Sequence, residues 1–260
     1  MSVPIALTIA GSDSGGGAGI QADLKTFHAF GVYGTSALTA ITAQNTLGVS
    51  AVHAVPSDIV RKQIDAVVSD LRPAACKTGM LASRDLVNTV ADAIHELSLQ
   101  PYVLDPVMVA TSGDRLLEPG AERAVRERLI PLATLVTPNL HEAAILVGFA
   151  VDHEAAMQEA ARTLVAHGAR AALVKGGHLT SQHLVDVLFD GKEMHSWERS
   201  RIETRNTHGT GCTLSAAIAA GLAHGRPLVR AVDEALAYIR RALLGAPGFG
   251  QGHGPLNHMV

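Results

Sequence analysis

The chain has 260 residues, with 47% hydrophobic and 17% charged residues and a formal net charge of -3 at pH 7. This length suits one large α/β domain or two small ones, and the absence of a basic tract argues against a nucleic-acid binder. Because no run approaches the roughly 20 apolar residues that span a bilayer, and no signal-like N-terminal core is present, we expect a cytoplasmic protein without membrane contact.

The first predicted element is a buried strand, Ile5 to Ala10, followed by a glycine-rich loop, Gly11 to Gly19. Ile20, Leu24 and Phe27 then recur at helical spacing. The loop has neither a following Gly-Lys-Ser/Thr nor a Gly-x-Gly-x-x-Gly register, which excludes a P-loop and a dinucleotide site. We expect it to approach a small, neutral, polar molecule instead.

The next stretch predicts strands at Tyr33 to Thr42 and Val49 to Val55, on either side of a loop at Ala43 to Thr46. A helix follows, with Ser57 as its expected N-cap. A short buried strand, Ala74 to Cys76, then leads to Lys77 and the residues that follow it.

The alternation of strands and helices continues to the end of the chain. Further strands are predicted at Tyr102 to Leu104, Thr134 to Val136 and Ala171 to Val174, with a hairpin from Leu184 to Trp197. Helices are predicted at 86–97, 120–129, 142–147, 154–166, 213–223 and 228–244. This order predicts a three-layer α/β/α fold with a mostly parallel sheet. Without an internal repeat or a linker, residues 1–260 are expected to form one domain.

Three charged residues follow predicted strands, at the sheet edge where ligands bind in such folds. Asp105 and Glu142 can hold Mg²⁺, partly through water, and Lys175 can neutralise phosphate charge beside Gly177, which lets a nucleotide come close. Each also fits an ordinary role, as a turn residue, a helix-start acid and a solvated lysine. Together they favour phosphoryl transfer.

The turn Gly209-Thr210-Gly211-Cys212 stands immediately before the apolar run Leu214 to Leu222. A helix that begins there directs unpaired amide groups and the positive end of its dipole at the space in front of the turn. That arrangement predicts a phosphate site. The alternative is that the glycines only let the loop enter a tightly packed helix.

The two cysteines, Cys76 and Cys212, are far apart and form no Cys-x-x-Cys, so neither a disulfide nor a zinc site is indicated. Cys212 at a helix N-terminus is expected to have a lowered pKa and to accept a proton from a substrate. It can equally serve to position the substrate hydroxyl, because a loose transition state demands little of a base. The thirteen histidines are scattered, and most are expected at the surface or in loops.

Five segments together resemble the hydroxymethylpyrimidine/phosphomethylpyrimidine kinase family of the ribokinase-like superfamily. They are Ala10 to Asp23, Asp105 to Val109, Thr137 to Leu140, Val174 to His178 and Asn206 to Leu214. The resemblance spans the whole chain, down to Gly252 to His258. It implies a usually dimeric enzyme that uses MgATP to phosphorylate 4-amino-5-hydroxymethyl-2-methylpyrimidine and then its monophosphate, for thiamine biosynthesis.

The resemblance also implies roles for individual residues. Gln44 reads the edge of the pyrimidine, and Gly11, Met80 and Val107 line the pocket around the ring, although core packing also explains Met80 and Val107. Cys212 matches the hydroxymethylpyrimidine branch, since the broader superfamily usually carries an Asp base there.

Two further expectations follow from the same resemblance. Residues 109–116 resemble a flap that closes over the substrate. Asp23 is expected as an exposed helical acid, with a position facing the pocket as the alternative.

Two rival functions remain open from the sequence. A pyridoxal or pyridoxine kinase, or an enzyme with both specificities, shares the expected fold and nucleotide site. A catalytically silent pyrimidine-binding protein would be expected to lose some of Lys175, Glu142, Asp105 or the Gly209 to Cys212 turn, and all of these are present.

Overall fold

The computed structural model describes residues 3–109, 113, 116–177 and 183–260. Its strands are β1 (Ile5–Ala10), β2 (Tyr33–Leu38), β3 (Ala40–Asn45), β4 (Gly48–Ala54), β5 (Ala75–Thr78), β6 (Tyr102–Leu104), β7 (Leu135–Val136), β8 (Ala172–Val174), β9 (His183–Phe189) and β10 (Met194–Ser200). Its α-helices are α1 (Gly19–Ala29), α2 (Ser57–Asp70), α3 (Arg84–Glu96), α4 (Ala121–Ala124), α5 (Leu140–Val147), α6 (Glu154–Ala166), α7 (Thr210–Ala223) and α8 (Leu228–Leu244).

Eight strands form one sheet in the order β10-β9-β8-β7-β6-β5-β1-β2. In this sheet β8, β7, β6, β5, β1 and β2 run parallel to one another. Strand β9 is antiparallel to β8, and β10 is antiparallel to β9. Leu7 at the middle of β1 pairs with Thr35 on one side and Cys76 on the other. The predicted mostly parallel sheet and the late hairpin are therefore confirmed.

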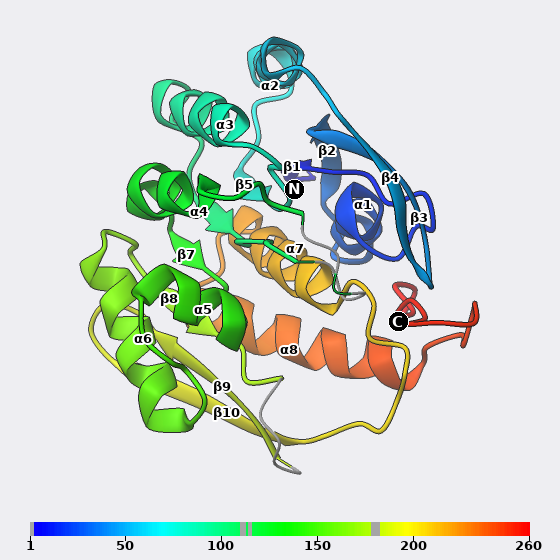
Figure 1. Cartoon of the computed structure of the whole chain (residues 1–260), viewed down its shortest axis with the longest axis vertical. Coiled ribbons are helices and arrows are strands. Elements are labelled where there is room, and N and C mark those ends of the chain that lie inside the picture. Colours follow the sequence, from blue (N-terminus) through cyan, green and yellow to red (C-terminus); the bar gives the residue numbers. More distant parts are fainter. Residues whose placement is uncertain (1–2, 110–112, 114–115, 178–182) are drawn as a thin grey trace.

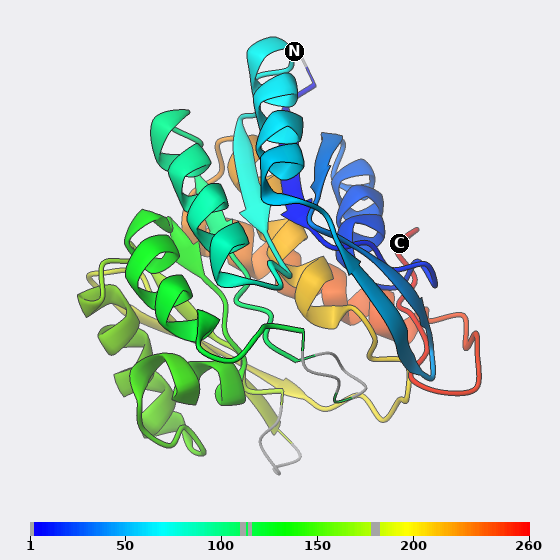
Figure 2. The same cartoon turned by 45° about the horizontal axis from the view of Figure 1, so that its top comes forward.

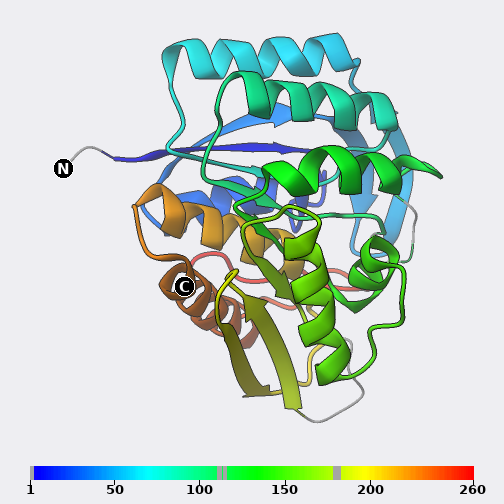
Figure 3. The same cartoon turned by 90° about the vertical axis from the view of Figure 1, so that its left-hand side faces the viewer.

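Helices cover both faces of the sheet, which gives the predicted three layers (Figures 1 and 3). Successive strand residues point to opposite faces, so Ala6 packs into the core under α1, α7 and α8, while Leu7 packs into the core under α2 to α6. Helix α7 is apolar on almost every side because it lies between the sheet, α1 and α8.

The predicted strand Tyr33 to Thr42 proved to be two strands. The chain leaves the parallel sheet at Thr39, whose N–H donates to the Ala10 carbonyl and whose hydroxyl donates to the Met80 carbonyl. It continues as β3, which pairs with β4 in a separate two-stranded sheet and includes Ala43–Asn45, predicted to be a loop. A change of sheet leaves the β-type residue pattern uninterrupted, which is why the sequence did not reveal it.

Two helix predictions also need correction. Helix α2 begins at Ser57 itself, with Pro56 as the N-cap and no side-chain cap. The helix predicted at 120–129 is a single α-helical turn, α4, followed by a π-helical turn from Val125 to Leu129 and a 3₁₀ turn at Ile130–Leu132. In the described part of the chain, no helix combines the length and apolar character that crossing a membrane requires.

The topology brings distant segments to one edge of the sheet. Strands β1, β5, β6, β7 and β8 all end there, because parallel neighbours share a direction. The hairpin of β3 and β4 stands beside this edge, and the C-terminal segment runs along its tip (Figures 1 and 2).

Candidate active site

A cavity of about 650 Å³ opens at the carboxyl ends of the parallel strands. All the site residues predicted from the sequence line it: Gly11, Gln44, Met80, Asp105, Val107, Glu142, Lys175, Gly177, Gly209, Thr210, Gly211 and Cys212. Residues up to 201 positions apart in the chain, as Gly11 and Cys212 are, thus share one cavity. The fold brings them together because each segment follows a strand end or begins a helix at the same edge.

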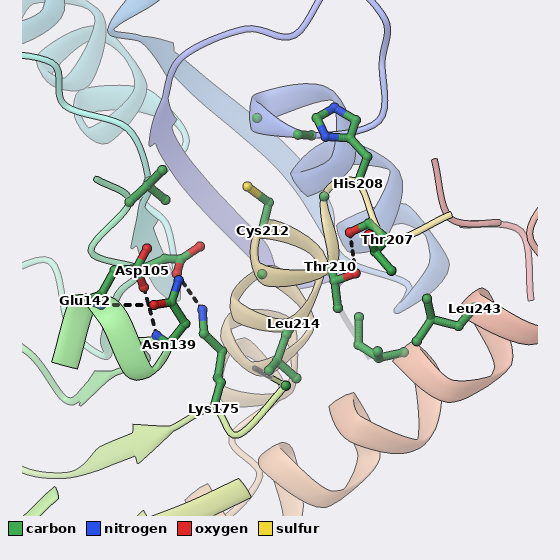
Figure 4. Close-up of a pocket in the computed structure, with 18 of the residues that line it drawn as sticks. Asp105, Asn139, Glu142, Lys175, Thr207, His208, Thr210, Cys212, Leu214 and Leu243 are labelled. Carbon is green, nitrogen blue, oxygen red and sulfur yellow. Dashed lines mark hydrogen bonds and ion pairs between the residues drawn. The ribbon is translucent and has the colours of Figure 1, made fainter. Parts of the chain in front are cut away.

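Asp105 and Lys175 form an ion pair at the floor of the cavity. Lys175 Nζ lies 3.2 Å from Asp105 Oδ1, and the side chains are 14% and 2% exposed (Figure 4). Ser215 Oγ donates to Asp105 Oδ2 at 3.2 Å. Burial disfavours the charge of Lys175, but Asp105 and Glu142 outweigh burial and raise the pKa of the ammonium. A full positive charge therefore faces the cavity at neutral pH.

Glu142 takes part in a capping box at the start of α5. The Asn139 side chain accepts from the Glu142 N–H at 2.9 Å, and Glu142 Oε2 accepts from the Asn139 N–H at 2.8 Å (Figure 4). The helix-start role considered from the sequence is thus confirmed. Burial, with a further contribution from Asp105, raises the pKa of Glu142 to about 7, although Lys175 opposes the shift.

Asp105 and Glu142 are suited to a magnesium ion whose remaining ligands are phosphate oxygens and water. Among the described residues, no cluster of three His, Cys, Asp or Glu side chains that could enclose a metal is present. Asp105 and Glu142 nevertheless line the same cavity, and their charges are close enough for Asp105 to raise the pKa of Glu142. Mg²⁺ binds through one or two carboxylates plus phosphate and water, so this pair suits it.

The turn from Gly209 to Cys212 opens helix α7 beside the ion pair at the floor of the cavity, since a Cβ on Gly211 would lie 3.3 Å from Lys175 Nζ (Figure 4). Gly209 is the N-cap with φ 80°, and a Cβ there would lie 1.8 Å from the Gly17 carbonyl oxygen. The first amide groups of any helix lack partners inside it, and here they belong to residues that line the cavity. The glycines therefore fit both roles considered from the sequence. They allow the loop to pack tightly against its neighbours, and they leave amide groups facing the cavity where an anion could bind.

Cys212 does not have the lowered pKa expected from its position. Burial raises the pKa of the thiol to about 11, while Lys77 opposes the shift and Asp23 and Asp105 reinforce it. The prediction of a lowered thiol pKa is therefore wrong. The helix terminus and a donated hydrogen bond from the Gly19 N–H are not enough to offset the loss of solvent.

Asp13 organises the glycine loop. Its carboxylate accepts from the amides of Gly15, Gly17 and Ala18 at 2.8 to 3.0 Å and pairs with His208 Nε2 at 2.9 Å. Burial opposes ionisation of Asp13, but these hydrogen bonds, led by the one from His208, hold its pKa below the usual value. The loop is therefore held in one shape by a buried negative charge.

The other predicted pocket residues lie around this loop. Gln44 sits at a β-bulge in β3, with its N–H and carbonyl both bonded to the Ser14 hydroxyl. A Cβ on Gly11 would lie 3.2 Å from Met80 Sδ, so only glycine lets Met80 pack at this distance. Met80 is 8% exposed and therefore serves the core as well as the cavity.

Asp23 is neither an exposed acid nor a pocket residue. It is fully buried on α1 and pairs with Lys77 of β5, with both carboxylate oxygens 2.9 Å from Nζ. The Thr8 hydroxyl donates to Asp23 at 2.6 Å. The expectation of an exposed acid failed because helical periodicity shows only which face of α1 Asp23 occupies. It does not show that a lysine from strand β5 reaches that face.

Sequence reasoning missed two groups of cavity residues. His208 lies in the segment between β10 and α7, as expected of most histidines, but it is 8% exposed and contacts Asp13, which the sequence did not indicate. The far end of the cavity is lined by apolar side chains of α7 and α8 and by arginines of β10, of the segment just after it and of α8, namely Leu214, Leu236, Ile239, Leu243, Arg199, Arg201 and Arg240. Most of the expected flap at 109–116 lies outside the described residues.

The sequence is similar to characterised families over nearly its whole length. The family model described as phosphomethylpyrimidine kinase matches residues 13–257. A hydroxymethylpyrimidine/phosphomethylpyrimidine kinase from Rhizobium meliloti is 56% identical over 98% of this chain and 96% of its own. A thiamine biosynthesis bifunctional protein, ThiED, from Geobacter sulfurreducens is 52% identical over 98% of this chain and 52% of its own.

A solved structure gives an independent comparison. The ADP complex of pyridoxal kinase from Bacillus subtilis superposes with a TM-score of 0.92 at 42% identity, covering 99% of this chain and 98% of that one. Agreement at this level extends to the arrangement of strands and helices, so the predicted ribokinase-like fold is confirmed.

Proposed function

This chain belongs to the phosphomethylpyrimidine kinase family, and we propose which of its residues carry out the family's reaction. The chain is a kinase that uses ATP to phosphorylate 4-amino-5-hydroxymethyl-2-methylpyrimidine and then its monophosphate, in thiamine biosynthesis. The observation that carries the assignment of residues is the shared cavity, in which a neutral pocket and a charged floor meet at the Gly209 to Cys212 turn.

The pyrimidine occupies the pocket formed by the glycine loop and the β3–β4 hairpin. Gln44 offers both an acceptor and donors to the aminopyrimidine edge, and Gly11, Met80 and Val107 enclose the ring. The substrate hydroxymethyl group then points toward Cys212. Because the raised pKa keeps the Cys212 thiol protonated at neutral pH, its first role is to orient the hydroxyl, and a loose transition state demands little of a base before the phosphoryl group is transferred.

The phosphates of ATP lie between Lys175 and the start of α7. Amide groups of Gly209, Thr210 and Gly211 cradle the transferring group, and Lys175 neutralises its charge. Asp105 and Glu142 would hold Mg²⁺ through water and the phosphates, and the ion would screen the phosphate charges. Gly177 leaves room for close approach, since among the described residues, apart from its chain neighbours, no atom lies within 4 Å of a Cβ built there.

The nucleoside of ATP fits the far end of the cavity. Leu214, Leu236, Ile239 and Leu243 offer an apolar surface for the adenine ring. This placement leaves the γ-phosphate beside the Gly209 to Cys212 turn and keeps the pyrimidine at the opposite end. In-line transfer requires that order of the two substrates.

The direct test is the mass of the product formed from hydroxymethylpyrimidine and MgATP. We expect a monophosphate at early times and a diphosphate later. The alcohol and its monophosphate must bind in turn in the same pocket, each with the group to be phosphorylated facing the Gly209 to Cys212 turn. If no phosphorylated species forms, the assignment is wrong. If only the monophosphate forms, the second step does not belong to this chain.

Pyridoxal phosphorylation is the second candidate, supported by the likeness to the Bacillus subtilis enzyme. Competing pyridoxal against hydroxymethylpyrimidine at equal concentration in one ATP-consumption assay separates the two. We expect the pyrimidine to be preferred. A preference for pyridoxal would reverse the order of the two functions.

We also propose that the chain acts as one domain and as a homodimer. Ile41, Leu47 and Val52 on the β3–β4 hairpin are 53%, 66% and 48% exposed, which is unusual for large apolar side chains. Light scattering on the intact protein gives the mass in solution. A dimer that dissociates in the Ile41→Asp variant supports the hairpin as the interface, and a monomeric wild type rejects it.

A further inference from the structure

The C-terminal segment 248–258 has no helix or strand of its own, yet it contacts several parts of the cavity wall. The N–H of Gly252 donates to Thr46 Oγ1 at 3.3 Å and the N–H of His253 donates to the Thr46 carbonyl at 2.9 Å. A Cβ on Gly252 would lie 2.0 Å from that same carbonyl oxygen. The segment therefore lies tightly against the turn between β3 and β4 (Figure 1).

The same segment holds the strand-like stretch that leads into α7. The N–H of His208 donates to the Gly254 carbonyl at 3.1 Å, and His208 forms an isolated parallel bridge with Pro255. A Cβ on Gly254 would lie 2.1 Å from Asn206 Oδ1. A Cβ on Gly17 would lie 2.6 Å from the His208 ring and 3.1 Å from Pro255. The glycine loop, His208 and the C-terminal segment thus form one packed unit.

The end of the segment is anchored on α7 and α8. Leu256 is 3% exposed, and the Tyr238 hydroxyl donates to the His258 carbonyl at 2.8 Å. His258 Nε2 lies 3.0 Å from the hydroxyl of Thr213, one residue after Cys212. Burial lowers the pKa of His258 to about 4, so the ring is neutral and forms a neutral hydrogen bond with Thr213.

Within this unit, His208 lines the cavity together with Asp13 of the glycine loop (Figure 4). Because Asp13 is ionised and can only accept, His208 Nε2 must donate its proton to Asp13 across 2.9 Å. The Gln44 amide group lies 3.5 Å from the same nitrogen. Because Nε2 then carries its proton toward Asp13 and has no lone pair, it cannot accept from the Gln44 NH2 group, so the amide oxygen is the end that suits this neighbour.

The second neighbour of the Gln44 amide is Thr42. Its hydroxyl has one proton, which it donates to the Ser12 carbonyl at 2.8 Å, so at 3.2 Å from Gln44 it can only accept. Both neighbours are satisfied when the amide nitrogen faces Thr42 and the amide oxygen faces His208. This orientation leaves one N–H and one lone pair free for the edge of an aminopyrimidine.

We propose that His208 is a positioning residue for the pyrimidine, which fixes the orientation of the Gln44 amide, and that the C-terminal segment 248–258 holds His208 in place. The proposal rests on the proposed function, because it takes Gln44 as the residue that reads the ring. It assigns a role to the Gly252 to His258 motif and to His208, neither of which the phosphate chemistry uses.

The first experiment replaces the His208 ring and measures both substrates. In His208→Gln the amide nitrogen can donate from the position of Nε2, whereas in His208→Asn the donor lies near the position of Nδ1. We expect His208→Asn to raise KM for hydroxymethylpyrimidine about 10- to 100-fold, the scale of a lost hydrogen bond to a charged group, with KM for ATP within about twofold. His208→Gln is expected to recover most of the loss.

The second experiment moves the C-terminal segment without touching His208. Gly254→Ala forces the segment away from Asn206 and is expected to raise KM for the pyrimidine about tenfold. Gly225→Ala is the matched control, since in the described part of the chain no atom beyond its local neighbours lies within 4 Å of its Cβ, and it follows α7 away from the cavity. It is expected to lower the melting temperature through its positive φ but to leave both KM values unchanged.

The outcomes distinguish this proposal from the proposed function. If the wild type phosphorylates the pyrimidine while His208→Asn and Gly254→Ala keep its KM within about twofold, the positioning role is rejected and the function stands. Equal loss in His208→Gln and His208→Asn also rejects it, because the role would then be packing. If the wild type forms no phosphorylated pyrimidine, the function itself fails.

Discussion

Two lysine–aspartate pairs lie within electrostatic reach of Cys212, and they differ in how completely they are closed. Lys77 and Asp23 are fully buried, with two contacts of 2.9 Å and a third partner in Thr8. Lys175 and Asp105 share a single contact of 3.2 Å, and Lys175 is 14% exposed to the cavity. The same chemistry thus produces a closed pair in the framework and an open pair at the site.

The difference shows how a fold separates stability from reactivity. A buried pair with every partner in place has no reason to rearrange, and removing one member leaves an uncompensated charge. A lysine with one moderate contact and a route to the cavity can exchange its carboxylate for a phosphate at little cost. We therefore expect Lys175 of the open pair to contact the phosphates of ATP.

The largest expected effect is on stability, in Lys77→Met. Asp23 would be left buried without its cation, and the free energy of unfolding at pH 7 should fall by about 3–5 kcal/mol, as measured by urea denaturation. Burial raises the pKa of Asp23, so the variant carries it protonated when folded and ionised when unfolded. The loss should therefore shrink as the pH falls toward 4.

The double variant Lys77→Met/Asp23→Asn is the control for this prediction. It removes both charges and keeps an acceptor for the Thr8 hydroxyl, so most of the stability should return. A Lys77→Met protein as stable as the wild type at pH 7 would contradict the framework role of the closed pair.

Lys175→Met should affect activity rather than stability. We expect kcat/KM to fall by about 10²–10³-fold, the usual loss when one group that stabilises transition-state charge is removed. Asp105 keeps hydrogen bonds from Ser215 and Thr137, so the melting temperature should change less than in Lys77→Met. Lys192→Met, on the exposed turn before β10, is the matched control. Activity near that of the wild type would show that the open pair does not touch phosphate.

Charges of both lysine–aspartate pairs act on the pKa of Cys212. The Cys212→Ala variant should have a kcat about 10²-fold below that of the wild type. The comparison with Cys212→Ser separates two roles, because a hydroxyl orients a substrate as a thiol does but ionises less readily. Serine activity close to that of cysteine favours positioning. Near-normal turnover of the alanine variant would remove Cys212 from the mechanism.

The smallest expected effect concerns the ionisation of Cys212. Because burial raises its pKa to about 11, the alkylation rate with iodoacetamide should still be rising above pH 9, and at pH 8 it should be at least about tenfold below that of a free thiol. Lys77 opposes this shift and Asp23 reinforces it, so the double variant without Lys77 and Asp23 tests the net contribution of the closed pair to the pKa of Cys212. Cys76 is buried, so a single alkylation is expected, and the intact mass shows whether one or two cysteines have reacted. A midpoint below pH 9 would contradict the raised pKa.

Much of the site was predictable because strand ends converge in a parallel sheet. Asp105 and Lys175 follow predicted strands, and that position alone placed them at one edge before any contact was known. The turn from Gly209 to Cys212 was predictable for a similar local reason, since glycines before an apolar helix leave amide groups free. Family resemblance added Gln44, for which the residue pattern by itself gives no signal.

What the sequence by itself determined is therefore the alternation of elements, the layer architecture and the residues at strand ends, all of which follow from local periodicity. Only the tertiary structure decided which charges meet. Asp23 lies 54 positions from Lys77, and His208 lies 195 positions from Asp13. Burial also reversed the expected pKa shift of Cys212. Such pairings depend on the register of strands and the packing of loops, and no local pattern encodes either.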